Sequence, residues 1–409
     1  MTVKAPTILL PNSNINLNKW AVVACDQFTS QPDYWDSVNQ LTKGAYSTRH
    51  ITLPEIYLPQ ADDKMINGIN DTIKSYLTQG VLREVGECFI LTVRNTPYTA
   101  QRVGLVLSVD LEDYDYRQGT SSLIRATEGT VIERIRPRVR IRKDALIELP
   151  HIMVLYDDPD NTVLNDLYNN RDKLPKLYDF DLMMNGGHIA GYQISNTAPV
   201  INKLNKLVKN GMLFAMGDGN HSLATAKAIW EQTKTTLSKS EQENHPARFA
   251  LVEAVNLFDE GLVFEPIHRV VFNCGKQLIE SLSIIGGERK CKLHYQGVDY
   301  CLNLPQSAIQ AVKSVQECID KYLALDKNAS VDYVHGESDV KKVADQHPQS
   351  VAIVLPTLAK EDLFDYVTTN GVLPRKTFSM GEAFEKRYYL EAKFIKTLTP
   401  EQRQQFKTK

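Results

Sequence analysis

The chain has almost no net charge. Its 47 lysines and arginines nearly balance its 49 aspartates and glutamates, so the formal net charge is -2 at neutral pH. Proteins that bind nucleic acid or anionic lipid carry an excess of positive charge, and the composition offers none overall. We therefore expect no nucleic-acid partner and no electrostatic attachment to a membrane.

Long apolar runs and paired cysteines are also missing. No stretch reaches the roughly 20 apolar residues that span a membrane, and polar residues with Pro11 interrupt the N-terminal region where a secretion signal would be apolar. None of the six cysteines forms a CxxC pair. They are Cys25, Cys88, Cys274, Cys291, Cys301 and Cys318. We expect a cytoplasmic protein without a zinc or redox cofactor.

What is present is enough apolar sequence for a large core. The chain has 409 residues, of which 43% are hydrophobic. Short apolar runs typical of strands, such as residues 88–93 and 101–110, alternate with helical patterns. We expect an α+β fold, a mixed β-sheet with flanking helices. Residues 1–275 would form the main body and residues 276–409 a C-terminal α/β portion that packs on it.

One stretch combines strand, turn and helix signals. Residues 212–216 are apolar and too short for a helix, whereas apolar residues recur at helical spacing from Leu223 to Trp230. Between them lies Gly217-Asp-Gly-Asn-His-Ser222, in which Asp218, Asn220 and Ser222 are each suitable N-caps. A strand-to-helix turn of this kind presents backbone N–H groups to an anion. The alternative is an ordinary tight turn with a surface histidine.

The chemistry of this box favours a functional site. Asp218, Asn220, His221 and Ser222 place a carboxylate, an amide, an imidazole and a hydroxyl within five positions after a buried strand. Asp26 follows another apolar run, residues 20–24, at a position where α/β sheets collect ligand groups. Asp26 is equally compatible with a turn or a helix cap.

Two later stretches carry further candidates. Residues 124–142 are rich in arginine and include Glu128 and Arg134, which suit either anion recognition or a solvated helix. The apolar runs 245–258 and 262–272 flank Asp-Glu-Gly and predict a hairpin, with a bend that delivers His268 and Arg269. His188, beside two glycines, is expected in a surface loop.

These motifs together resemble a bacterial family known as domain of unknown function 1015. Its Asp-Gly-His-His-Arg box corresponds to Asp218–Ser222, with Asn220 and Ser222 in place of a histidine and the arginine. Its Pro-x-His-Arg and Pro-x-Lys-Thr patterns match residues 266–269 and 374–377, and its acidic motif is echoed by residues 127–134. The chain thus resembles a divergent branch of that family.

The resemblance implies a fold and a ligand. The family's box is similar to that of ParB and sulfiredoxin-like domains, some of which bind nucleotides and one branch of which phosphorylates free serine. This implies a ParB/sulfiredoxin-like core with large additions and a phosphate cradle at the box. ATP or ADP with Mg²⁺ would be the cofactor and a small molecule such as serine the partner.

The leading hypothesis is a nucleotide-dependent phosphotransferase acting on a small hydroxylated metabolite. Asp218, His221 and Glu128 would be catalytic, with Asp218 and Glu128 holding Mg²⁺. The predicted phosphate- or ligand-binding residues are Gly219, Asn220, Ser222, Arg134, Arg269, His268, Asp26 and Lys376. A non-catalytic nucleotide- or metabolite-binding regulator is the second hypothesis, and a hydrolase using Ser222 or His221 is the third. The sequence leaves the oligomeric state open.

Overall fold

A computed structural model describes residues 2–406 and divides them into two compact units. Unit 1 runs up to Ala126, continues over Thr130–Leu262 and takes in the C-terminal segment from Glu382. Unit 2 comprises Val263–Gly381 and Thr127–Gly129. This division differs from the expected boundary after residue 275, because the last segment of the chain pairs with strands of unit 1.

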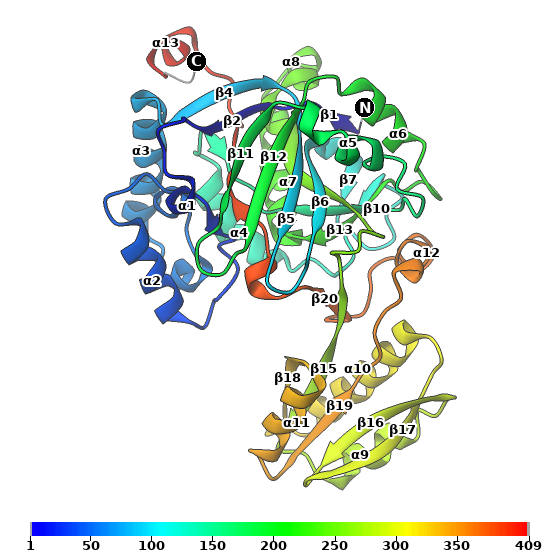
Figure 1. Cartoon of the computed structure of the whole chain (residues 1–409). Coiled ribbons are helices and arrows are strands. Elements are labelled where there is room, and N and C mark those ends of the chain that lie inside the picture. The colour runs from blue at the N-terminus through cyan, green and yellow to red at the C-terminus, as the bar shows by residue number, and fades with distance from the viewer. Residues whose placement is uncertain (1, 407–409) are drawn as a thin grey trace. The chain divides into compact units, whose positions relative to one another are not determined.

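Unit 1 is built on a large mixed sheet. In order across the sheet, its strands are β11 (Lys176–Asp181), β12 (His188–Ile194), β5 (Phe89–Asn95), β6 (Arg102–Asp110), β14 (Phe249–Asn256), β10 (Met153–Tyr156), β13 (Phe214–Asp218), β8 (Ile124–Arg125) and β7 (Tyr114–Asp115), with β1 (Val3–Lys4) on β6. Most neighbours are antiparallel, but β10–β14, β13–β8 and β8–β7 are parallel. Figure 1 shows β11, β12, β5 and β6 side by side. The α+β fold with a mixed sheet is confirmed.

Both faces of this sheet are buried. Side chains that alternate along a strand enter two different apolar clusters: Phe89 and Leu91 join one and Ile90 the other, and the same holds for residues 250–252. The helices and short strand pairs of unit 1 cover these faces. They are α1 (Leu17–Trp20), α2 (Pro32–Thr42), α3 (Asp63–Gln79), α4 (Ile132–Arg142), α5 (Asn165–Asn169), α6 (Ala198–Asn205), α7 (Asn220–Lys234), α8 (Lys239–Asn244) and α13 (Pro400–Gln405), with the pairs β2 (Thr7–Pro11) with β4 (Leu82–Glu87), β3 (Val22–Val23) with β21 (Tyr388–Tyr389), and β9 (Ile147–Glu148) with β22 (Lys393–Phe394).

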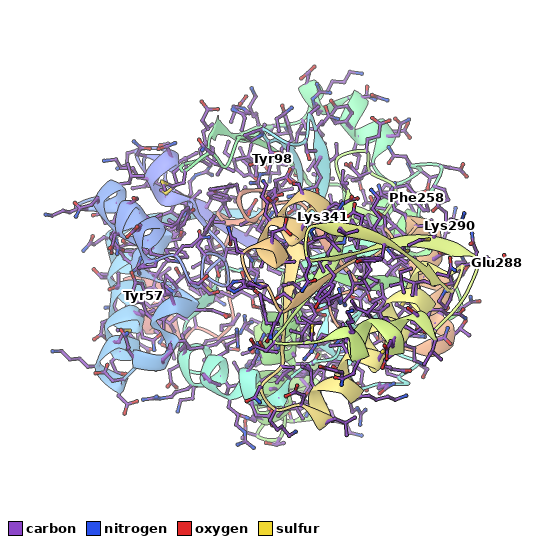
Figure 2. The ribbon with its side chains drawn as sticks, turned by 90° about the horizontal axis from the view of Figure 1, so that it is seen from below. Tyr57, Tyr98, Phe258, Glu288, Lys290 and Lys341 are labelled. Atoms are coloured by element: carbon purple, nitrogen blue, oxygen red, sulfur yellow. The ribbon has the colours of Figure 1, made fainter. Side chains whose placement is uncertain are left out.

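Unit 2 has its own sheet and core. Its strands are β15 (Phe264–Phe272), β16 (Arg289–Tyr295), β17 (Val298–Leu304), β18 (Ser330–His335), β19 (Ser350–Val354) and β20 (Phe378–Met380), and its helices are α9 (Lys276–Ser283), α10 (Ala308–Leu325), α11 (Glu337–Asp345) and α12 (Lys360–Asn370). On its surface, Lys341 Nζ lies 2.7 Å from Asp299 and 2.9 Å from Glu337 (Figure 2). The described part of the chain contains no helix long and apolar enough to cross a membrane.

Three local expectations are wrong. The predicted hairpin does not form, because β14 pairs with β6 and β10 whereas β15 pairs with β18, β19 and β20 in unit 2. His188 opens strand β12 rather than lying in a loop, since its neighbours pair with β5. Helix α7 is preceded by Gly219, with φ of 80°, and not by any of the three expected side-chain caps.

Candidate functional site

The strand-to-helix turn predicted at the box is confirmed. Strand β13 ends at Asp218, Gly219 turns the chain in the left-handed region, and α7 begins at Asn220. Two features of this position favour glycine. Its φ is positive, and a Cβ would lie 3.0 Å from the Cα of Ile152. The turn therefore packs directly on the chain that enters β10.

Asp218 is held at the mouth of this turn. Its Oδ1 accepts the N–H of Gly219 at 2.9 Å, and its Oδ2 lies 3.3 Å from the Nζ of Lys386. Lys386 comes from the C-terminal segment, and its charge also contributes to lowering the pKa of Asp26. One lysine is thus close to two carboxylates that are almost 200 positions apart in sequence.

His151 connects the box to Asp26. Its Nε2 lies 3.2 Å from Asp26 Oδ2 and 3.4 Å from Ser222 Oγ, and its Nδ1 lies 3.1 Å from the hydroxyl of Tyr389. Strand β10 is antiparallel to β13, and Met153 faces Asp218, so the start of β10 meets the end of β13 at one edge. The structure therefore gathers Asp26, Asp218 and Ser222 around a histidine.

Charge pairing decides the protonation of this group. Burial alone would lower the pKa of His151, but Asp26 and then Asp218 and Glu55 outweigh it and raise the pKa above its usual range. Burial would likewise raise the pKa of Asp26, yet His151 holds it well below its usual range. These pKa shifts favour the imidazolium–carboxylate form of the pair, in which His151 is buried and Asp26 is partly exposed.

This geometry does not support a serine nucleophile. In a Ser-His-Asp triad the carboxylate and the serine bind opposite nitrogens of the imidazole. Here Asp26 and Ser222 share Nε2 of His151, and an imidazolium cannot accept the serine proton. Burial raises the pKa of the nearby Cys25 thiol to about 12, so it is not a thiolate either. The geometry therefore does not support the form of the hydrolase hypothesis in which Ser222 is the nucleophile.

A cavity of about 160 Å³ lies beside His151 and Ser222. Its walls come from α3, α4, the start of α7 and the segment around residues 51–58. Half of its lining residues are aliphatic, and the charged groups are two ion pairs, Glu55–Arg138 and Glu148–Arg142, together with His151. The charged cluster at the box therefore borders a largely apolar space.

The other box residues lie in the first turn of α7. Asn220 is half-buried, and its Oδ1 atom is buried with no hydrogen-bond partner among the residues the structure describes. The backbone carbonyl of His221 accepts the Thr225 hydroxyl at 2.7 Å. Gly219 offers no side chain to cap the start of α7, and its carbonyl accepts the N–H groups of Ser222 at 2.9 Å and Leu223 at 3.0 Å.

The fit of Mg²⁺ to these residues is limited but adequate. Within residues 2–406, no cluster of three or more His, Cys, Asp or Glu side chains is placed to hold a metal ion. Mg²⁺ that accompanies nucleotide phosphates needs only one or two carboxylates, since phosphate oxygens and water complete its shell. Asp218 is the carboxylate of unit 1 best placed for that role, after displacement of Lys386.

The remaining sequence candidates are distributed over both units. Arg134 lies on α4 of unit 1, where its carbonyl accepts from the Arg138 guanidinium. Glu128, His268, Arg269 and Lys376 belong to unit 2. The structure thus groups the box with Asp26 in unit 1, and groups Glu128 with Arg269 in unit 2.

His268 and Arg269 have internal partners in unit 2. The fully buried Arg269 guanidinium donates to the carbonyls of Ile267, Arg375 and Lys376, and so joins residues 375–376 to β15. His268 Nδ1 accepts the N–H of Leu355 at 3.1 Å, and burial lowers the pKa of His268 to about 4, so it stays neutral. These contacts give the two side chains a stabilising role within unit 2.

Sequence reasoning missed His151, Lys386 and Tyr389. His151 stands just before an apolar strand, and pairing that strand antiparallel to β13 would have brought it to Asp218. Lys386 and Tyr389 carried no comparable signal, because they reach the site only through the return of the C-terminal segment to β3.

The chain belongs to a family of proteins of unknown function, DUF1015, whose family model matches residues 9–327. A conserved hypothetical protein from Pyrococcus furiosus is similar in structure, with 12% identity, a TM-score of 0.37 and coverage of 69% of this chain and 93% of that one. A free serine kinase variant in complex with AMP gives 10% identity, a TM-score of 0.40 and coverage of 70% and 91%. Another variant of that kinase, in complex with ADP, has 9% sequence identity and a TM-score of 0.39, and the match covers 70% of this chain and 91% of that one. No curated protein matches the sequence.

Proposed function

We propose that the protein is a nucleotide-dependent phosphotransferase that acts on a small hydroxylated metabolite, for which serine is the candidate suggested by the family's resemblance to ParB and sulfiredoxin-like domains. One observation carries the proposal. A carboxylate, Asp218, and an ammonium group, Lys386, lie 3.3 Å apart at the N-terminus of a long helix, beside the Asp26–His151 pair.

The phosphates of ATP or ADP would bind at the start of α7. The N–H groups of its first turn and the positive end of its dipole favour an anion, and Gly219 allows close approach. Asp218 would repel a phosphate, but Lys386 offsets this charge. The N–H₂ group of the Asn220 amide would donate to a phosphate oxygen.

Phosphoryl transfer needs positioning and charge neutralisation more than covalent chemistry. Asp218 would either hold Mg²⁺ or accept the proton of the attacking hydroxyl, since only its contact with Lys386 must open. Bound Mg²⁺ would neutralise charge on the transferred phosphoryl group. The His151 imidazolium would supply a fixed positive charge near Ser222. Asp26, with its lowered pKa, would stabilise that charge and would not act as a base.

The second candidate is a non-catalytic nucleotide- or metabolite-binding regulator. It is favoured by Asn220 and Ser222, which stand where the family's box has a histidine and an arginine. Both candidates predict that ADP with Mg²⁺ stabilises the protein, because a ligand that binds only the folded state raises its melting temperature. The two candidates differ in catalysis, because only the phosphotransferase would turn over the nucleotide.

The test is a phosphotransfer assay with Asp218→Asn. Asparagine keeps an oxygen for the Gly219 N–H but removes the charge and the basicity, so we expect activity to fall by about 10²–10⁴-fold. Asp144→Asn is the matched control, because that carboxylate is 67% exposed and lies on the surface. Activity in Asp218→Asn equal to the parent, at an unchanged melting temperature, would reject the catalytic role. Nucleotide binding without turnover in the parent would favour the regulator.

A further inference from the structure

We propose that the cavity beside His151 holds the apolar body of the phosphate acceptor. The acceptor would be a hydroxyl compound with an aliphatic or aromatic body, in preference to a small polar metabolite such as free serine. The inference rests on the proposed phosphotransfer function and replaces serine, as the candidate acceptor, with a less polar hydroxyl compound.

The lining of the cavity is the first argument. Leu53, Ile69, Ile73, Ile141 and Ile147 present aliphatic surface to a space of about 160 Å³. A cavity of about 150 Å³ with similar walls is large enough for benzene. Serine has a single apolar carbon in its side chain and would leave most of this surface without contact.

A buried amide supplies the second argument. Asn70 on α3 lines the cavity and is only 9% exposed, yet its Oδ1 has no hydrogen-bond partner among the described residues. A buried polar atom without a partner destabilises a fold, and such groups often serve a ligand. The acceptor would therefore carry a second hydrogen-bond donor at the end of its apolar body.

Position decides which substrate the cavity receives. His151 and Ser222 are themselves lining residues, so a group in the cavity touches the charged cluster directly. The base of a nucleotide is separated from its terminal phosphate by the ribose and the other phosphates. The apolar body of the acceptor, attached close to the reacting hydroxyl, suits this position better than a nucleobase.

The test uses nucleotide-free protein and the straight-chain alcohols from ethanol to hexanol, with serine and adenosine for comparison. Binding is followed by chemical-shift titration or by melting temperature. If alkyl groups enter the cavity, Kd should fall by about fourfold for each added methylene until the cavity is full. Ala145→Leu, which fills the cavity from its wall, should remove this dependence.

Asn70 is tested with a pair of leucine substitutions on α3. Asn70→Leu should weaken binding of 1,4-benzenedimethanol by about fivefold while leaving benzyl alcohol unaffected, because only the diol has a second donor. It should also raise the melting temperature, since an unpartnered amide is removed. Asn67→Leu is the control at an exposed position of the same helix. Equal losses for both ligands would overturn the role of Asn70.

The outcomes separate the two proposals. Serine or adenosine binding more tightly than hexanol, or alcohol binding that ignores chain length and Ala145→Leu, would overturn the cavity proposal even if phosphotransfer is found. Length-dependent alcohol binding supports the cavity proposal even if no nucleotide-dependent turnover of any alcohol is detected. In that case only the proposed phosphotransfer fails.

Discussion

At the scale of single residues, the unexpected feature is an ion pair between a buried histidine, His151, and the partly exposed Asp26. His151 is only 4% exposed, and its charge is sustained by three carboxylates from separate parts of the chain. Desolvation makes such a pair costly unless both partners are present. Loss of either member should therefore disturb the site more than loss of an exposed residue.

His151→Gln should destabilise the protein in a pH-dependent way. The pKa of His151 is raised in the folded state, so its contribution is complete below the unfolded value of about 6.5 and is lost as pH rises through the folded pKa. We expect a loss of about 2–3 kcal/mol at pH 6, below the range for fully buried pairs because Asp26 stays partly exposed. Urea unfolding at pH 6 and pH 9 measures it.

The control for this prediction is His335→Gln, at an exposed position of unit 2, which should show no comparable loss. A His151→Gln loss that is as large at pH 9 as at pH 6 would contradict a charged His151.

At the scale of elements, the site depends on how β13 passes into α7. The turn combines positive φ at Gly219 with close contact to Ile152, and it sets the direction in which Asp218 and the first N–H groups of α7 point. The proposed phosphate site therefore depends on an element boundary rather than on any one side chain.

Gly219→Ala should cost about 1–2 kcal/mol of unfolding free energy, because a Cβ is unfavourable in the left-handed region and meets the Ile152 backbone. It should also weaken ADP binding, since the turn must move. Thermal melts with and without ADP measure both effects.

Gly68→Ala is the matched control, and it should raise the free energy of unfolding where Gly219→Ala lowers it. Gly68 lies inside α3, and a Cβ there meets nothing within 4 Å, so alanine should stabilise by about 0.5–1 kcal/mol. If Gly219→Ala were equally neutral or stabilising, the turn would not be constrained as described.

At the scale of the whole chain, the C-terminal segment completes unit 1. After the residues of unit 2, the chain returns to pair β21 with β3 and β22 with β9. Arg387 in this segment binds Glu253 of β14 at 2.8 Å and also binds Glu391, with all three side chains at most 6% exposed. A residue near the end of the chain thus neutralises charge in the centre of the large sheet.

Arg387→Met should destabilise unit 1 by about 3–5 kcal/mol at neutral pH, because it leaves buried carboxylates without their partner. Burial would raise the pKa of Glu253, but Arg387 and Arg102 lower it to about 2. The contribution of Glu253 is therefore present above its unfolded pKa and disappears as pH falls towards 2. Denaturant unfolding at pH 7 and pH 3 tests this. Arg403→Met, on the exposed face of α13, should change little.

Local sequence patterns were sufficient to predict several helices and strands. The apolar runs at residues 88–93 and 101–110, which were expected to be strands, form β5 and β6. The box was recognisable as a strand-to-helix turn because apolar spacing changes from a short run to a helical period there. In each case the signal lies within about 20 neighbouring residues.

The sequence by itself determined the α+β class, the turn at Asp218–Ser222 and the family, because these depend on local spacing and short motifs. Only the tertiary structure decided which distant groups join that turn. Asp26, His151 and Lys386 come from three remote segments, and no local pattern encodes their meeting. Their charges and pKa values follow from burial and from neighbours brought together by sheet pairing, so the chemistry of the site is a property of the folded chain.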